Sequence, residues 1–253
     1  MTAQGLDSNA EHQARVDLAA CHRLAVMYGF HEGIDNHLTL LVPGYTDRFL
    51  LAPFGLHWSE VRASDFLVVG LDGVIHSGSG DIEDTAFYIH APIHAAHPKN
   101  RCVLHTHMPH ATALSMLEDP TLEMSSQNAI GFAGQVAYDC DYRGFALDRT
   151  EGERMAAAMG ERSVLILRNH GIVTAGVSVA DAFNSLYFFE RAAQAQILAM
   201  STGRPLRVVP DAIVSHMVEQ MKASENVGQH SRIDLHFTAL KRVLDRREPD
   251  YAH

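Results

Sequence analysis

The chain has 253 residues, of which 47% are hydrophobic and 20% charged, and it contains no low-complexity tract; this composition excludes disordered and fibrous proteins and is typical of a soluble, enzyme-sized domain. The formal net charge of -10 and the pI near 5.9 exclude a nucleic-acid partner, because binding to a phosphate backbone depends on clustered Lys and Arg. No stretch approaches the roughly 18 apolar residues that span a bilayer, so we expect a cytoplasmic protein with no membrane partner.

The first predicted element is an amphipathic helix over residues 9–28. Its apolar residues recur at three- and four-residue spacing from Val16 to Met27, and Gly29 ends the pattern. Residues 1–8 precede this pattern and are predicted to be a flexible start. Four short strands follow, at residues 37–43, 48–53, 66–72 and 73–77. The tight Asp-Gly turn between the last two predicts a hairpin and therefore antiparallel pairing.

The middle of the chain alternates helices with further strands. Residues 83–97 have helical spacing, although Pro92 should kink this helix or mark its first turn. Residues 101–107 are an apolar, β-branched run without a helix cap, which predicts a buried strand. The remaining predicted elements are helices at 109–118, 127–132 and 152–160, strands at 135–140, 163–168 and 171–176, and a helix from a Ser178 cap to about Met200.

This order of elements predicts the fold class. Strands and helices alternate irregularly and carry hairpin signals, so we expect an α/β protein with a mixed, mainly antiparallel central sheet between two helical layers. No linker divides the chain, and residues 1–253 are predicted to form one three-layer α/β/α domain. Residues 225–253 are expected to be a helical tail on the domain surface or on a neighbouring subunit.

The three cysteines argue against a disulfide framework. Cys21, Cys102 and Cys140 are odd in number and far apart in sequence. Such usage is typical of reduced thiols in a reducing compartment. We expect all three to be packing residues.

Two histidine motifs carry the functional signal among 17 histidines. His105 and His107 end the predicted buried strand, where residues two apart point to the same face. One His-x-His triplet is roughly what chance gives in such a chain, so the second motif decides. His170 lies in an Asn-His-Gly sequence between two predicted strands, where it can reach a neighbouring strand end. Three histidines with an open position are typical of a catalytic metal site.

These motifs resemble the class II aldolase/adducin family. The resemblance covers residues 15 to 205 and is carried by HTHMPHATALS, RNHGIVTAG and the downstream ERAAQAQ helix. It implies an α/β/α domain, assembly as a homo-oligomer, usually a tetramer, and active sites near subunit interfaces. It also implies that His105, His107 and His170 bind a divalent metal ion, for which zinc is the first expectation and manganese, iron and cobalt are alternatives.

The resemblance implies a reaction as well. In this family the metal chelates two substrate oxygens and, as a Lewis acid, stabilises the enolate left when a carbon–carbon bond breaks. The family's phosphate-binding Gly-Asn-x-Ser turn reads Asn36-His37-Leu38-Thr39 here, and Asp84 stands where an acid would repel phosphate. We therefore expect a metal-dependent carbon–carbon lyase that acts on an unphosphorylated hydroxy-carbonyl or a hydroxy- or keto-acid.

The family's catalytic carboxylate and tyrosine are displaced in this sequence. Ala86 matches the carboxylate position, and Glu83, one helical turn upstream and on nearly the same face, is the expected catalytic base. The alternative for Glu83 is an acid that complements the helix dipole. Gln127 or Asn128 lies near the position of the tyrosine. The predicted substrate-binding residues are Asn36, His37, Thr39, Gln127 and Asn128.

Three other functions stay open. A metal-dependent decarboxylase of a hydroxylated aromatic or heteroaromatic acid would use the same metal, and the missing tyrosine and the displaced carboxylate favour it slightly. A non-haem iron oxygenase is compatible with three neutral histidines. A non-catalytic, adducin-like interaction domain would be expected to lose the metal ligands, which this sequence retains.

Other histidines have weaker functional signals. His90 and His94 are four residues apart in HAPIH, which lacks the Glu of the HExxH zinc motif, so packing or solvent exposure is expected. His37, His57 and His110 could line a pocket near the metal, and His37 is favoured because its turn matches the family's substrate-binding loop.

Overall fold

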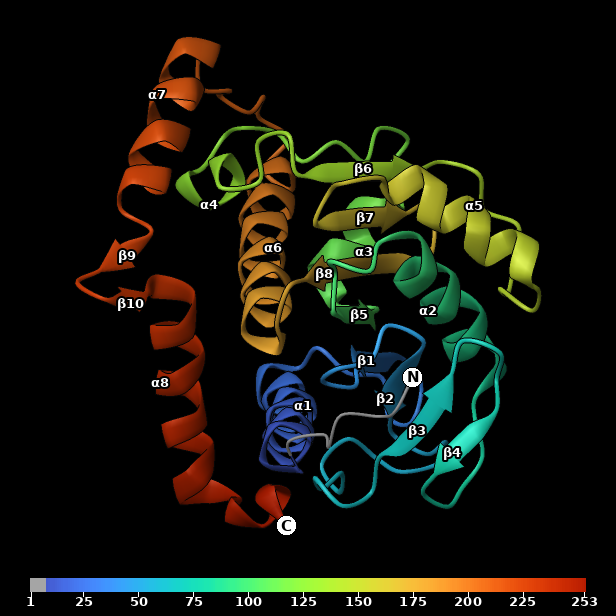
Figure 1. The fold of residues 1–253 in the computed structure, drawn as a ribbon. Helices are drawn as coiled ribbons and strands as arrows, with labels where there is room; N and C mark the ends of the chain where they lie inside the picture. Colours follow the sequence, from blue (N-terminus) through green and yellow to red (C-terminus); the bar gives the residue numbers. More distant parts are fainter. Residues whose placement is uncertain (1–7) are drawn as a thin grey trace.

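The short apolar runs pair into one eight-stranded sheet in the computed structural model, which describes residues 8–253. The strand order is β4-β3-β2-β1-β5-β8-β7-β6 (Figure 1). In that order the strands are Ile75–Ser77, Leu67–Gly70, Arg48–Leu51, His37–Leu41, Cys102–Thr106, Gly171–Gly176, Val164–Leu167 and Val136–Asp139. Among these neighbours only β6 and β7 run parallel. The predicted mixed, mainly antiparallel sheet is confirmed, and so is the β3–β4 hairpin.

Helices cover both faces of the sheet (Figure 1). One face packs against a core that includes α1 (Ser8–Tyr28), α3 (Pro109–Ser115), α4 (Gln127–Ile130), α6 (Val179–Met200) and α8 (Arg232–Arg247). The other face packs against α2 (Asp84–Ala96) and α5 (Arg149–Met159). Burial of apolar residues on both sides of the strands confirms the three-layer α/β/α architecture.

The pleat of β5 and β1 decides which side chains can form a site. Cys102 and Leu104 of β5 pack in the core of α1 and α6, whereas Val103 packs in the core of α2 and α5. The register pairs His37 with His105 and Thr39 with Val103. Because alternate side chains share a face, all four of the paired residues point to the α2 side of the sheet.

The region after α6 departs from the sequence expectation. Helix α7 (Asp211–Ala223) and the two-stranded hairpin β9 (Asn226–Val227) and β10 (His230–Ser231) were not expected. The tail then forms α8 and a final 3-10 helix, Pro249–Ala252. Both pack on the domain: α8 contributes Phe237, Leu240 and Leu244 to the core, and Tyr251 is buried. At the other end, α1 begins at Ser8; the rest of the predicted flexible start, residues 1–7, lies outside the described part of the chain.

The cysteines follow the prediction only in part. Cys21 and Cys102 are buried and free, as expected. Cys140 is free but exposed, so its assignment as a packing residue is wrong. It comes directly after β6, where the chain leaves the sheet. Within residues 8–253 no helix combines the length and the apolarity that a membrane crossing requires.

Candidate metal centre

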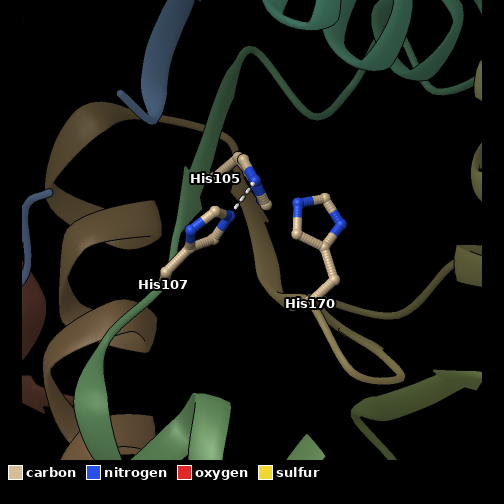
Figure 2. Close-up of side chains that lie close together, drawn as sticks. All are labelled: His105, His107 and His170. Atoms are coloured by element: carbon tan, nitrogen blue, oxygen red, sulfur yellow. Dashed lines mark hydrogen bonds between the residues drawn. The ribbon is translucent and has the colours of Figure 1, made fainter. Parts of the chain in front are cut away.

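Three histidines at one end of the central strands of the sheet converge on one point (Figure 2). His105 is in β5, His107 directly follows that strand, and His170 lies in the turn between β7 and β8. Each residue offers one ring nitrogen, and these atoms all lie within 4.8 Å of one another. The structure thus brings the three predicted ligands together, and this triad could bind a metal ion.

The backbone of the Asn-His-Gly turn explains why Asn169 and Gly171 flank His170. Asn169 has φ +56°, a left-handed conformation that Asn tolerates better than most residues. A Cβ atom at Gly171 would lie 2.6 Å from the Thr106 carbonyl oxygen and 2.7 Å from His107 Cδ2. Only glycine allows the turn to approach the end of β5 this closely, and that approach delivers His170 to the triad.

Hydrogen bonds at the far side of two rings fix how they face each other. His105 Nδ1 lies 2.9 Å from the Ile172 carbonyl oxygen, and His107 Nδ1 lies 2.7 Å from Glu32 Oε2. Both oxygens can only accept, so in the neutral rings the Nδ1 atoms carry the protons and the Nε2 atoms carry lone pairs. Partners of this kind orient metal-binding histidines in known sites.

The Nε2 atoms of His105 and His107 are then spaced as two ligands of one cation would be. These atoms lie 3.1 Å apart, the contact dashed in Figure 2. Two lone pairs at this distance repel unless a positive centre lies between them. Zinc–nitrogen distances of about 2.0–2.1 Å with tetrahedral angles place two ligand nitrogens about 3.3 Å apart. The donor set therefore fits a divalent metal ion.

Burial keeps two imidazoles of the triad, those of His105 and His170, in the neutral state that metal binding needs. Desolvation, followed by the charges of neighbouring histidines, lowers the pKa of His105 well below its usual value. The pKa of His170 is lowered to about 4, mainly by desolvation and then by His107, while Glu32 acts in the opposite direction. Neutral imidazoles are the form that binds metal, so little proton competition is expected near pH 7.

The triad opens into a cavity of about 390 Å³, called here the triad cavity. Its polar lining includes carboxylates and amide or hydroxyl groups, and its wall is otherwise apolar. The polar liners besides the triad are His22, Glu32, Asp35, Asn36, His37, Glu83 and Thr85. The apolar liners include Ile34, Leu51, Phe54, Leu56, Trp58, Phe145 and Leu147. No Lys or Arg lines this cavity among the described residues 8–253.

Glu83 reaches the triad cavity from the first turn of α2. It is the N-cap of that helix, and its Oε2 accepts hydrogen bonds from Ala86 N at 2.6 Å and Thr85 Oγ1 at 2.5 Å. Its side chain keeps 27% exposure. The neighbouring Asp84 is exposed and does not line the cavity. Glu83 thus caps the helix and also lines the cavity that the triad lines, and its role as catalytic base stays a prediction.

Two of the predicted substrate-binding residues lie at the same cavity. Asn36 has φ +71° and accepts a hydrogen bond from His107 N through its Oδ1 at 3.1 Å. The ring of His37 lies 4.9 Å from that of His105, centroid to centroid. Thr39 does not reach the cavity. It is fully buried, and its hydroxyl faces His90 and His94 because its pleat position points under α2.

Gln127 and Asn128 do not line the triad cavity of their own chain. They line a second cavity of about 680 Å³ between α4, α6, α7 and α8. A single chain therefore does not bring them to the triad, and their role in substrate binding remains a prediction for a site shared between subunits. His57 and His110 do not line the triad cavity either: they hydrogen-bond Ser59 and Glu190.

Sequence reasoning missed Glu32. Its carboxylate holds His107, 75 residues further along the chain, and it lines the triad cavity. Glu32 belongs to the irregular segment between α1 and β1, where no periodicity assigns a direction to a side chain. The only sequence signal that points to Glu32 is its place four residues before Asn36, in the segment expected to bind substrate.

The chain is similar to known proteins over most of its length. Residues 16–197 match the model of the Class II Aldolase and Adducin N-terminal domain. A Caulobacter vibrioides protein named "Putative aldolase class 2 protein" is 35% identical over 254 aligned residues, which cover 100% of this chain and 96% of that protein. Alpha-adducin of Rattus norvegicus is 37% identical over 215 residues, or 81% of this chain and 29% of adducin. A crystal structure of an aldolase II superfamily protein from Pseudomonas syringae superposes with a TM-score of 0.89 and 38% identity, covering 97% of each chain.

Proposed function

The chain belongs to the class II aldolase/adducin family, and we propose that it is a divalent-metal-dependent carbon–carbon lyase. The substrate class is an unphosphorylated hydroxy-carbonyl or a hydroxy- or keto-acid. The observation that carries this proposal is the convergence of His105, His107 and His170 beside the Glu83 carboxylate in one cavity. Zinc is the metal that three histidines with an open position suit first, with manganese, iron and cobalt as alternatives.

The residues around the triad have distinct roles in this reaction. When bound, a divalent ion would act as a Lewis acid toward a substrate carbonyl. Glu83 is the proposed base, which takes up or returns the proton that moves when the carbon–carbon bond breaks. Asn36 Nδ2 is buried and has no hydrogen-bond acceptor in the described part of the protein, so it is free to donate to a substrate oxygen.

The lining of the triad cavity supports an unphosphorylated substrate. Glu32, Asp35 and Glu83 give the cavity acidic groups, and none of its lining residues within 8–253 is Lys or Arg to balance a phosphate. A dianion would be repelled and would lose its hydration without compensation. The apolar wall instead suits a substrate that carries an alkyl or aryl portion.

The aromatic part of this wall also supports a second function. Phe54, Trp58 and Phe145 line the cavity, and no tyrosine hydroxyl does so within residues 8–253. A decarboxylase of a hydroxylated aromatic acid needs a flat, apolar site and the same metal. Both reactions leave electrons on a carbon next to a carbonyl or hydroxyl group, and they differ only in the group released.

A substrate panel separates these functions. Protein loaded with zinc, manganese, cobalt or iron is incubated with hydroxyketones, 4-hydroxy-2-oxo acids and hydroxylated aromatic acids, and aldehyde and carbon dioxide are measured. Aldehyde release that is lost in Glu83→Gln supports the lyase, and carbon dioxide release supports the decarboxylase. Preference for a phosphorylated sugar over its unphosphorylated counterpart would contradict the proposed substrate class. Oxygen consumption would point to the iron oxygenase, and absence of metal-dependent turnover to an adducin-like domain.

A further inference from the structure

A network of buried polar side chains lies behind the triad cavity and has no part in the function proposed above. His90 and His94 are one turn apart on α2 and fully buried. Both face the hydroxyl of Thr39 on β1: Thr39 Oγ1 lies 2.5 Å from His90 Nδ1 and 2.8 Å from His94 Nε2. His37, Thr39, His90 and His94 are called here the buried histidine network. It forms because His37 and Thr39, two residues apart on β1, share one face of the strand, and His90 and His94, four residues apart on α2, share one face of the helix.

The network ends at the triad cavity. His90 Nε2 lies 2.8 Å from His37 Nδ1. His37 Nε2 lies 3.3 Å from Thr85 Oγ1, which in turn donates to Glu83 Oε2 at 2.5 Å. Five hydrogen-bonded contacts thus connect His94, under α2, with the proposed catalytic carboxylate.

Packing of the protein interior does not by itself explain why these polar side chains are buried. The surrounding interface of β1 and α2 is built from residues such as Leu41, Ile89 and Ile93. Three imidazoles and a hydroxyl cost free energy to bury unless their hydrogen bonds are made. Burial keeps these rings neutral, since it lowers the pKa of His37 and that of His94 to about 3.

The carboxylate sets the direction of the hydrogen bonds. Glu83 Oε2 accepts a hydrogen bond from the Thr85 hydroxyl. Thr85 Oγ1 is therefore free to accept a hydrogen bond from His37 Nε2–H. His37 Nδ1 must then accept from His90 Nε2–H, His90 Nδ1 from Thr39, and Thr39 from His94 Nε2–H. The opposite direction would turn the Thr39 hydroxyl proton towards His94 Nε2 and the Thr85 hydroxyl proton towards His37 Nε2, and Thr85 could then no longer donate to Glu83 Oε2.

We propose that Thr39 and His90 are positioning residues, which hold His37 as the Nε2–H tautomer with this N–H directed at the edge of the triad cavity. His37 then presents one fixed N–H, which a substrate oxygen beside the metal ligands would share with Thr85 Oγ1. The inference rests on the proposed function only in taking this cavity as the reaction site. It assigns to Thr39 a role one layer behind the substrate instead of direct substrate contact.

Neutron diffraction from crystals of the perdeuterated protein tests the direction of the network. The expected map has deuterium on Nε2 of His37 and His90 and none on their Nδ1 atoms. Deuterium on His37 Nδ1, or split between its two nitrogens, would overturn the proposal. This measurement involves neither metal nor substrate, so its outcome is independent of the proposed function.

Paired variants test whether the network matters to the cavity. Thr39→Val removes the hydroxyl at nearly constant volume, whereas Thr39→Ser keeps it. The readout is the affinity of cobalt-loaded protein for acetohydroxamate, a small chelator with two adjacent oxygens, followed by visible absorbance. We expect Thr39→Val to weaken binding about three- to tenfold, as for one lost hydrogen bond, with cobalt content unchanged and Thr39→Ser close to the unmodified protein.

Thr85→Val with Thr85→Ser as its partner gives a second test at the partly exposed end of the network, where folding is less at risk. The same loss and rescue are expected there. Equal affinities in the valine and serine variants of both pairs would contradict the role of the network. Failure of cobalt to bind the unmodified protein would sink the proposed function instead, and the neutron map would still decide the tautomer.

Discussion

At the scale of single residues, the left-handed backbone of Asn169 is a direct requirement of the triad. Its side chain is exposed, so a substitution there tests conformation without changing core packing. Asn169→Val should lower the free energy of unfolding by about 1–2 kcal/mol more than Asn169→Gly, because a β-branched residue strains this conformation and glycine does not. Urea titration of both variants measures the difference, and equal stabilities would contradict the conformational role.

The buried His22 should make stability depend on pH. It packs against Trp58 and Phe66, and desolvation lowers its pKa to about 4. Between pH 6.5 and 4 the unfolded chain binds a proton at His22 and the folded chain does not, so stability falls as the pH falls, by at most about 1.4 kcal/mol per pH unit for one such histidine. His22→Phe should therefore show a shallower loss of stability than the unmodified protein in urea titrations at pH 7, 6 and 5. Parallel pH dependences would refute this assignment.

The triad could be predicted from sequence because each ligand lies where local geometry has few options. Strand alternation gives His105 and His107 one face, and an Asn-His-Gly turn leaves His170 at a strand end. Thr39 was assigned to the substrate because its turn matches a family motif. Its true surroundings depend on the register of β1 against α2, which no local pattern in the sequence contains.

At the scale of elements, the packing of α2 against α5 depends on one glycine. Pro92 has no N–H to donate to the Tyr88 carbonyl, and α5 approaches at this place through Gly152. A Cβ atom at Gly152 would lie 1.8 Å from Tyr88 O and 2.7 Å from Pro92 Cγ. Gly152→Ala should therefore destabilise the protein by about 1–3 kcal/mol or more, despite the higher helix propensity of alanine.

A control on the same helix makes this test specific. Glu153 is exposed, and within residues 8–253 its ion pair is with Arg149, four residues earlier, so Glu153→Ala should cost less than about 0.5 kcal/mol. Thermal or urea unfolding measures both variants. Gly152→Ala with the stability of the unmodified protein would show that α2 and α5 are not closely packed at this position.

The elements that the sequence predicted best are those with strong periodicity or caps. Ser178 accepts a hydrogen bond from Asp181 N at the start of α6, as its capping pattern predicts. Helix α7 was missed because it follows Pro210 without a side-chain cap and none of its residues is buried in the single chain. Its sequence does show helical spacing, since Val214, Met217, Val218 and Met221 lie three or four residues apart, but these residues are only partly buried in the single chain.

At the scale of the whole molecule, α7 suggests how copies associate. We propose that the chain forms a homo-oligomer and that α7 takes part in the contact, because Ile213 on this helix is 54% exposed. Ile213→Asp should shift the mass measured by light scattering towards the 27.9 kDa of one chain, while Glu219→Ala on the same helix should not. A monomeric unmodified protein, or an unchanged mass in Ile213→Asp, would refute this proposal.

The overall architecture was predictable because hairpin signals and alternating helices restrict the topology strongly. The strand order was not, since pairing of β1 with β5 and of β6 with β7 joins segments that no short-range signal connects. The position of Gln127 and Asn128 at a second cavity is likewise a property of the assembled fold. Whether they reach a neighbouring triad depends on the oligomer.

Metal analysis of the purified protein tests the central claim most directly. Elemental analysis without added chelator should find one divalent ion per chain in the unmodified protein and almost none in His107→Ala. His76→Ala, which changes an exposed histidine of β4, is the control and should retain the metal. Absence of stoichiometric metal from the unmodified protein, or an equal amount in His107→Ala, would contradict the assignment of His105, His107 and His170 as a metal centre.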